Sequence, residues 1–399
     1  MKIRSFFVST MFWVFMGIVC PIQAQVVIGG LADFEIRKGG SDSSPYVNQT
    51  PNANWSVYTP YLRLFIQGDL SEKWFISAAL QADHYEGTKL SPVFFSLMNI
   101  NYLPFQSSNF TVSAGRIVIP YGAYSKRVLS SENPFVHLPL THAAGLPISK
   151  THGTLYNNVD YGEDVNGLTM IYQRMYTQGV MVKDRLGENE WLQYELAATL
   201  ASASSFFEYG EHSKPAFTGR VVLHPVVWGS VGFSLSSGPF LKKDVANGVL
   251  SDEDLSKYTQ TLIGTDLQLS YHYLTFLASY NWSEWKTPYF NPETTPRDYL
   301  WDDRVEVQHI STELIADFAF FPGAYAGIRL ERLLPGDISS YSDITNPVRP
   351  WSYDRDRVEL VTGIKLQRNV IFKASYLFAT DNGPNLKDDV FTLQISAGF

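Results

Sequence analysis

A regular alternation of strand-like segments with short turns and longer loops constrains the fold of this chain more than any other feature. The candidate strands are Val26–Arg37, Trp55–Gln67, Lys73–Asp83, Val93–Leu103, Phe110–Ile119, Gly179–Leu186, Trp191–Ala201, Ala216–His224, Val227–Ser236, Thr259–Ser270, Leu274–Trp285, Val307–Phe320, Ala324–Leu333, Arg357–Gln367, Val370–Thr380 and Asp389–Phe399. Most are long enough for a tilted membrane crossing of about 9–11 residues. An even strand number, with short turns on one side and longer loops on the other, is typical of membrane barrels. The sequence therefore predicts an all-β fold, a transmembrane antiparallel up-and-down β-barrel of about 16 strands. A strand at Thr169–Tyr176, inside the longest loop, would disturb this count.

Apolar and polar residues alternate along these segments. In the last one, Phe391, Leu393 and Ile395 share a face, and Thr392 and Gln394 share the other. The apolar faces would meet lipid and the polar faces would line a lumen. Charged residues expected to line the lumen are Arg63, Lys73, Asp83, Arg116, Glu195, Arg220, Asp266, Glu313, Asp317, Arg329, Glu331, Glu359, Lys365 and Lys373. Because basic and acidic residues are balanced, this wall predicts a weakly selective channel.

Composition is consistent with a membrane barrel. Charged residues make up 18 % and aromatic residues 15 % of the 399 residues, whereas soluble domains carry about 25 % charge. Beyond the N-terminus no apolar run is long enough for a transmembrane helix. A large soluble all-β protein is the alternative on composition alone.

The N-terminus has the pattern of a secretory signal. Lys2 and Arg4 precede an apolar stretch from Phe6 to Val19, and Ala24 offers a cleavage position, which predicts a signal peptide at 1–24 and a barrel at 25–399. Cleavage removes the only cysteine, Cys20, and takes the net charge from −8 to −10. An acidic mature chain argues against nucleic acid as a partner. A lipoprotein modification of Cys20 is the less favoured interpretation, because bulky Val19 precedes it.

One segment, 120–178, interrupts the rhythm of strands. We expect this third outer loop to fold into the lumen as a constriction, because structureless loops of this length are usually functional. Its candidate residues, with the neighbouring strand, are Arg116, Lys126, Arg127, His137, His142, Lys150 and His152. They predict a mild preference for anions that increases as the histidines protonate near about pH 6. Alternatively, Arg116 pairs with a carboxylate across the lumen, and Lys126 and Arg127 form a solvated or lipid-phosphate-binding patch.

Other chemistries find less support. The three histidines match no compact metal motif, and no nucleophile signature such as G-x-S-x-G occurs, so the sequence predicts no metal, no cofactor and no enzyme. A plugged receptor would need an additional N-terminal domain, yet strand-like sequence begins almost at residue 25.

The C-terminus carries a family resemblance. The final alternating strand ends in Phe399, which resembles the signal read by the barrel-insertion machinery of Gram-negative bacteria. The strand count and long third loop resemble general porins, and Gly115-Arg116-x-x-x-Pro120-Tyr121-Gly122 is similar to a segment of phosphate-selective porins. The resemblance implies an outer-membrane homotrimer, surrounded by lipid and lipopolysaccharide, that conducts small hydrophilic solutes and ions. A substrate-specific channel for phosphate, an organic acid or a sugar is the alternative; no ladder of basic residues favours phosphate.

Overall fold

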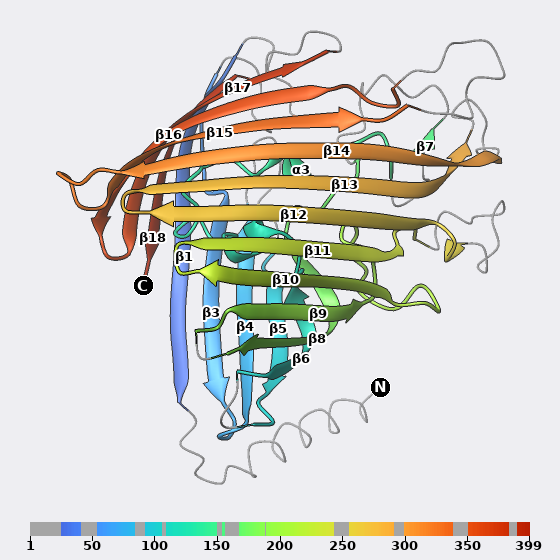
Figure 1. The fold of residues 1–399 in the computed structure, drawn as a ribbon, viewed down its shortest axis with the longest axis horizontal. Helices are drawn as coiled ribbons and strands as arrows, with labels where there is room; N and C mark the ends of the chain where they lie inside the picture. The colour runs from blue at the N-terminus through green and yellow to red at the C-terminus, as the bar shows by residue number, and fades with distance from the viewer. Residues whose placement is uncertain are drawn as a thin grey trace, which may run out of the picture.

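The computed structural model describes residues 25–40, 54–83, 92–105, 109–149, 154–155, 167–187, 189–242, 255–290, 299–337, 350–382 and 389–399. Their strands form one sheet that closes on itself and is antiparallel except at one strand of two residues (Figure 1). Its strands are β1 (Val26–Gly39), β2 (Trp55–Tyr58), β3 (Tyr61–Asp69), β4 (Trp74–Asp83), β5 (Phe94–Tyr102), β6 (Thr111–Val118), β7 (Thr154–Leu155), β8 (Tyr176–Leu186), β9 (Leu192–Thr199), β10 (Ala216–Val226), β11 (Gly229–Pro239), β12 (Thr259–Tyr271), β13 (Leu274–Phe290), β14 (Tyr299–Asp317), β15 (Ala324–Pro335), β16 (Arg355–Gln367), β17 (Val370–Asp381) and β18 (Val390–Gly398).

The barrel has sixteen wall strands. β2 and β3 act as one strand broken near Pro60, since both pair with β1, and the two-residue β7 only adds to the rim beside β13. β1 pairs with β18 from Leu31↔Gly398 to Gly39↔Val390, which closes the sheet. The predicted all-β antiparallel barrel is confirmed. Thr169–Tyr176 is not a strand apart from its last residue, where β8 begins.

The strands of the barrel wall differ in length. β13 and β14 have 17 and 19 residues, whereas β6 and β9 have 8 each. Short turns join strands at one end, seen at the left and bottom of Figure 1. Two short helices, the 3-10 helix η1 (Ala123–Lys126) and α3 (Leu140–Ala143), lie in the connection between β6 and β8. No helix among the described residues is both long and apolar enough to cross a membrane.

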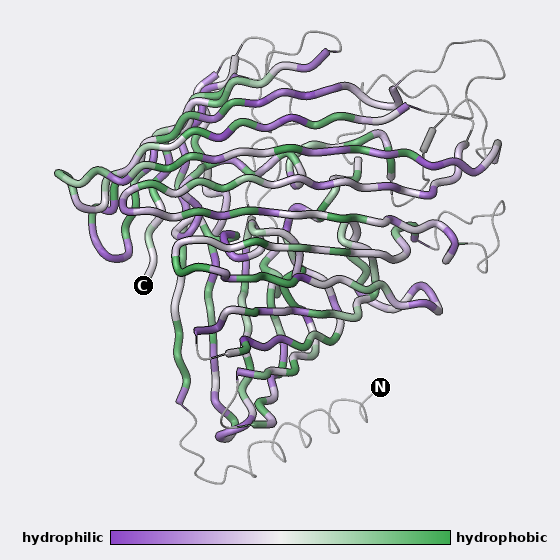
Figure 2. The backbone as a smooth tube through the Cα atoms, viewed as in Figure 1, coloured by the Kyte–Doolittle hydropathy of each residue, from purple (hydrophilic) through white to green (hydrophobic). Residues whose placement is uncertain are grey.

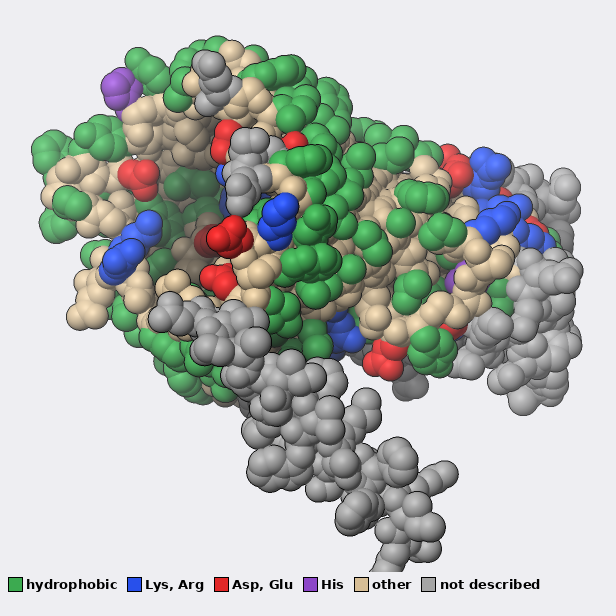
Figure 3. Space-filling view, turned by 90° about the horizontal axis from the view of Figure 1, so that it is seen from below, with side chains coloured by type: hydrophobic (Ala, Val, Ile, Leu, Met, Phe, Trp, Pro, Cys, Tyr) green, Lys and Arg blue, Asp and Glu red, His purple; other side chains and the backbone are tan. Residues whose placement is uncertain are grey.

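The outer surface of the barrel is apolar. On β11, Phe233 and Leu235 are exposed, while Ser234 and Ser236, which alternate with them, are buried. Hydropathy alternates in this way along many strands (Figure 2), and hydrophobic side chains cover much of the outside beside a hollow with charged side chains (Figure 3). Side chains alternate across a strand, so one face meets lipid and the other lines the interior.

The interior contains a hydrophobic core at the end of the barrel that carries the longer connections. Its members come from the β6–β8 loop and from the strand ends around it; they include Ile119, Tyr121, Leu140, Ile148, Met170, Phe240, Leu255, Trp285, Val305, Leu333 and Trp351. Tyr121 and Trp285 are completely buried. The loop is therefore a packed part of the fold and does not rely on hydrogen bonds alone.

Candidate functional site

The β6–β8 loop begins with a turn held against the inner wall. The hydroxyl of Tyr121 donates to Asn281 Oδ1 at 3.1 Å, and the Gly122 backbone N–H donates to Ser234 Oγ at 3.0 Å. Gly264 leaves room for the Tyr121 ring, because a Cβ at this position would collide with the ring's hydroxyl. These contacts direct the chain away from β6 and along the inside of β11–β13.

Further along, basic side chains of the wall bind backbone carbonyls of the loop. Lys373 Nζ donates to the carbonyl oxygens of Ser130 and Asn133 at 2.6 and 2.7 Å. Arg329 Nη2 donates to the His137 carbonyl at 2.8 Å, and Arg357 binds the carbonyl of Leu138. Arg329 and Lys373, which the sequence assigned to the channel lining, thus bind the loop instead.

Two carboxylates of the same wall bind the loop's N–H groups. Glu359 Oε1 accepts from the backbone of Val136 and His137 at 3.0 and 3.2 Å, and Glu331 Oε1 accepts from the backbone of Leu140 at 2.8 Å. Arg329 pairs with Glu359 and with Glu331, the latter at 3.2 Å, and all three side chains are fully buried. Buried charges are tolerated when they are paired, as they are here, although Arg329 Nε and Nη1 have no hydrogen-bond partner among the described residues.

The two described histidines of the loop lie inside this network. His137 Nδ1 is 3.0 Å from Glu359, and His142 packs on Tyr124 with a ring separation of 4.8 Å. Burial lowers the pKa of His137, which Glu359 opposes, and lowers the pKa of His142 to about 3. The expected gain of positive charge near pH 6 is therefore wrong for His142, and burial acts against it at His137.

A cavity of about 250 Å³ lies between the loop and the inner face of the opposite part of the wall. It is lined by side chains of β4–β6, β8 and β9 and by the loop residues Ser125 and Lys126. Lys126, whose side chain is 55 % exposed, forms an ion pair with Glu195. Lys183 lies directly across the β8–β9 pairing from Glu195, so the described lining of the cavity holds two lysines and one carboxylate.

Neutral polar side chains form the rest of the polar lining. Asn101 Nδ2 donates to Asn99 Oδ1 at 2.7 Å, and Ser113 Oγ donates to Asn101 Oδ1 at 2.6 Å. These side chains were not among the lumen residues predicted from the sequence, which were all charged. Counting every second residue along β5 and β6 would have found them.

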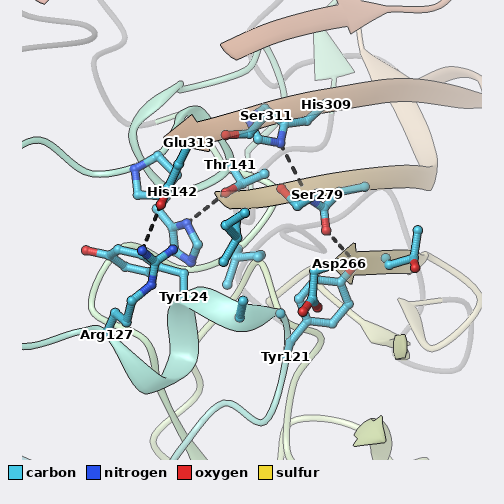
Figure 4. Close-up of a pocket in the computed structure, with 18 residues that line it drawn as sticks. Tyr121, Tyr124, Arg127, Thr141, His142, Asp266, Ser279, His309, Ser311 and Glu313 are labelled. Atoms are coloured by element: carbon cyan, nitrogen blue, oxygen red, sulfur yellow. Dashed lines mark hydrogen bonds and ion pairs between the residues drawn. The ribbon is translucent and has the colours of Figure 1, made fainter. Parts of the chain in front are cut away.

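A smaller cavity of about 40 Å³ lies between the loop and β12–β14 (Figure 4). Arg127 reaches Glu313 at 2.7 Å there, and Arg220 pairs with Asp266 at 2.5 Å. Such a volume has room for about three or four water molecules, given about 10–15 Å³ for each. Arg127 thus joins the loop to Glu313 of β14, whereas Asp266 of β12 binds Arg220 of β10, two strands away on the same wall.

Arg116 does not face the lumen. It lies opposite exposed Met98 on the outer side of β6, where its guanidinium stacks on Tyr176 and Phe206 at 5.1 and 4.8 Å and binds the carbonyl of Phe95. The predictions that Arg116 lines the lumen, or pairs across it, are wrong. The strand period shows why: Val112, Ala114 and Val118 share the apolar face with it.

The other predicted residues occupy varied positions. Arg63 is buried and its guanidinium lies 4.8 Å from the ring of Tyr61. Lys73, Asp317 and Lys365 are exposed close to the short turns. Asp83 ends β4, but its side chain lies outside the described part of the structure, as do Lys150 and His152. No group of three or more His, Cys, Asp or Glu side chains in the described ranges is placed to hold a metal ion.

Comparison with known proteins identifies the fold. No family model matches the sequence, and no curated protein matches it. Solved structures do match: the anion-selective porin from Comamonas acidovorans has a TM-score of 0.58 at 10 % identity, over 94 % of this chain and 100 % of that chain. The outer membrane channel DcaP of Acinetobacter baumannii gives 0.59 at 11 % identity, over 94 % and 97 %. OmpT of Vibrio cholerae in its trimer form gives 0.54 at 9 % identity, over 94 % and 99 %. The chain has the fold of bacterial outer-membrane porins.

The porin fold accounts for the apolar exterior. A closed barrel leaves no unpaired backbone edge in lipid, and its exposed face carries large hydrophobic residues. This is the architecture of a protein of the bacterial outer membrane. The C-terminal Phe399 completes the closure, since its backbone N–H and carbonyl both bind Gly30 at 3.1 Å.

Proposed function

We propose that this protein is an outer-membrane porin through which small hydrophilic solutes and ions diffuse passively. The observation that carries the proposal is the polar cavity of about 250 Å³ between the β6–β8 loop and β4–β9, inside a barrel with an apolar exterior. The loop forms one side of this passage and narrows it. No catalytic role is assigned to the chain.

The proposed selectivity is a mild preference for anions. Most charges on the β14–β18 wall are paired within the protein or bound to the loop, so they contribute little field in the passage. Lys126 and Lys183 face one carboxylate, Glu195, in the cavity lining. Charges that line a constriction set its selectivity, and here the sum is positive.

The processing and assembly of the chain are part of the proposal. Residues 1–24 are removed on export, so the mature chain begins at Gln25, which N-terminal sequencing of protein from outer membranes would test. The matching Vibrio cholerae OmpT is described as a trimer; we extend this assembly to the present chain, in lipid and lipopolysaccharide, with Phe399 presented to the insertion machinery. Light scattering of the detergent-solubilised protein would test the trimer.

Single-channel recording in planar bilayers tests the channel directly. Wild type should give stepwise currents. In a potassium chloride gradient, the reversal potential should be shifted toward the equilibrium potential of chloride. Glu195→Gln should strengthen this shift, because it removes the only carboxylate among the described residues that line the cavity. Absence of stepwise current from correctly folded protein would contradict the porin proposal.

A bulky substitution in the lining tests whether ions pass through this cavity. Ser125 lines it from the loop and bonds only the nearby Gly122 carbonyl, at 2.8 Å. Ser125→Trp should lower the conductance severalfold, whereas the matched Ser125→Ala should leave it near wild type. Equal conductance in the two variants would mean that ions take another route.

A further inference from the structure

The charged part of the cavity is poised to accept an anion. Lys126 Nζ pairs with Glu195, and Lys183 lies opposite the same carboxylate in the register of β8 and β9. Directly opposed residues in antiparallel strands have Cβ atoms about 4.5–5.5 Å apart. The described lining therefore holds two ammonium groups and one carboxylate, and a second carboxylate, supplied by a solute, would balance the charge.

Beside these charges one part of the lining is apolar. Ile117, Met181 and Ala197 form a small hydrophobic cluster on the inner wall. Phe75 and Leu97 line the same cavity from β4 and β5. Such a surface inside a lumen is unfavourable next to water and favourable next to an apolar group of a solute.

The neutral polar groups offer few free hydrogen-bonding sites to a solute. Asn99, Asn101 and Ser113 bond one another at 2.6–2.7 Å, and Asn99 Nδ2 also donates to the Arg116 carbonyl at 3.1 Å. A polyhydroxylated solute, which needs many partners, would have to break these bonds. Sugars therefore fit the lining less well than a solute with one charged end.

We propose that this cavity is a binding site for small monocarboxylates with an apolar body. The carboxylate lies between Lys126 and Lys183, and the apolar body lies against Phe75, Leu97 and Met181. The inference rests on the proposed function in one respect, that solutes reach the cavity through the channel. Ligand pockets commonly combine an apolar lining with a few placed charges in this way.

Block of the chloride current tests the site, with benzoate as the probe at pH 7. Glycolate keeps the carboxylate without the apolar body, and benzamide keeps the ring without the charge. Benzoate should reduce the current at about a tenfold lower concentration than either. Glycolate lacks the apolar contact, and even one methylene discriminates by about 10–200-fold in a hydrophobic pocket. Benzamide lacks the negative charge that faces the lysines. Equal potency of the three compounds would overturn the proposal.

Variants assign the effect to the two halves of the site. Lys183→Met should raise the half-blocking concentration of benzoate about tenfold. Phe75→Ser should raise the half-blocking concentration of benzoate close to that of glycolate. The control is Lys214→Met, an exposed lysine just before β10 and away from the cavity, which should leave the block unchanged. Wild-type block in Lys183→Met, with folding verified by the gel shift on heating, would also overturn the proposal.

Failure of the channel and failure of the site give different results. If wild type carries no chloride current, the proposed function fails, and benzoate binding is then measured by titration calorimetry on the detergent-solubilised protein. Heat of binding that is lost in Lys183→Met would support the site without the channel. Current without any preference for benzoate would leave the porin and remove the site.

Discussion

Removing the charge of Glu359 should release the β6–β8 loop from the wall. One oxygen of this carboxylate accepts from the backbone of Val136 and His137, from His137 Nδ1 and from Ser375 Oγ, at 2.8–3.2 Å. The other oxygen binds Arg329. In Glu359→Gln the amide oxygen can keep the first set of bonds, but the amide N–H₂ then faces a guanidinium that also only donates.

The size of the effect follows from burial. The Arg329 and Glu359 side chains are both fully buried, and breaking a buried ion pair by removing one partner costs about 3–5 kcal/mol. Arg329 retains Glu331 at 3.2 Å, so we expect the lower end, a loss of about 3 kcal/mol in the free energy of unfolding. The matched control is Glu284→Gln: Glu284 pairs with Arg304 at 3.4 Å, and Arg304 is 68 % exposed, so the loss should be about 1 kcal/mol or less.

Two measurements follow this change. Urea unfolding in detergent, monitored by tryptophan fluorescence, gives the free energy of unfolding, and planar-bilayer recording gives the current. Glu359→Gln should unfold at lower urea and show larger, noisier steps, because the loop is less firmly held. If the free energies of unfolding of Glu359→Gln and Glu284→Gln differ by less than about 1 kcal/mol and the two variants have the same conductance, the buried charges around Glu359 do not hold the loop.

Three more predictions address particular positions. Arg116→Gln should leave the reversal potential unchanged, unlike Lys126→Gln, and should lower the free energy of unfolding by about 1–2 kcal/mol through the lost ring contacts; an altered reversal potential would contradict its outward position. Because burial lowers the pKa of His142 to about 3 from 6.5, the folded state should lose stability as the pH falls from 6.5 toward 3, and urea titrations should show a weaker pH dependence in His142→Gln. Gly115→Ala should reduce the yield of folded barrel on gels, since Gly115 has φ 125° and its Cβ would strike the Met98 carbonyl; Gly68→Ala, whose nearest contact is at 4.0 Å, should fold normally.

The positions of the wall strands could be predicted from the sequence because a membrane strand is a local pattern. Side chains alternate with a period of two, lipid selects apolar residues on one face, and turn residues end each segment. Phe391, Leu393 and Ile395 carry this signal in β18 without reference to the rest of the chain. The same period of two places Arg116 on the outer face, as the structure does. The prediction that Arg116 lines the lumen was wrong because it did not follow this period.

The contacts of the loop could not be predicted in this way. Glu359 meets Val136 across 223 residues of sequence, and no local pattern records such a pairing. The lumen charges appeared as a balanced set in the sequence, yet pairing removes Arg329, Glu331 and Glu359 from the passage and leaves Lys126, Lys183 and Glu195 beside it. The lowered pKa of His142 follows from its burial, which the sequence does not specify.

The sequence by itself thus determined the barrel, its strand order and the division between a lipid face and an inner face, because these depend on neighbours in the chain and on the solvent. Only the tertiary structure decided which inner charges bind the loop, which line the cavity, and where apolar side chains meet inside the tube. Those outcomes depend on distances between segments far apart in the chain, and the interaction of two charges is set by their separation and burial.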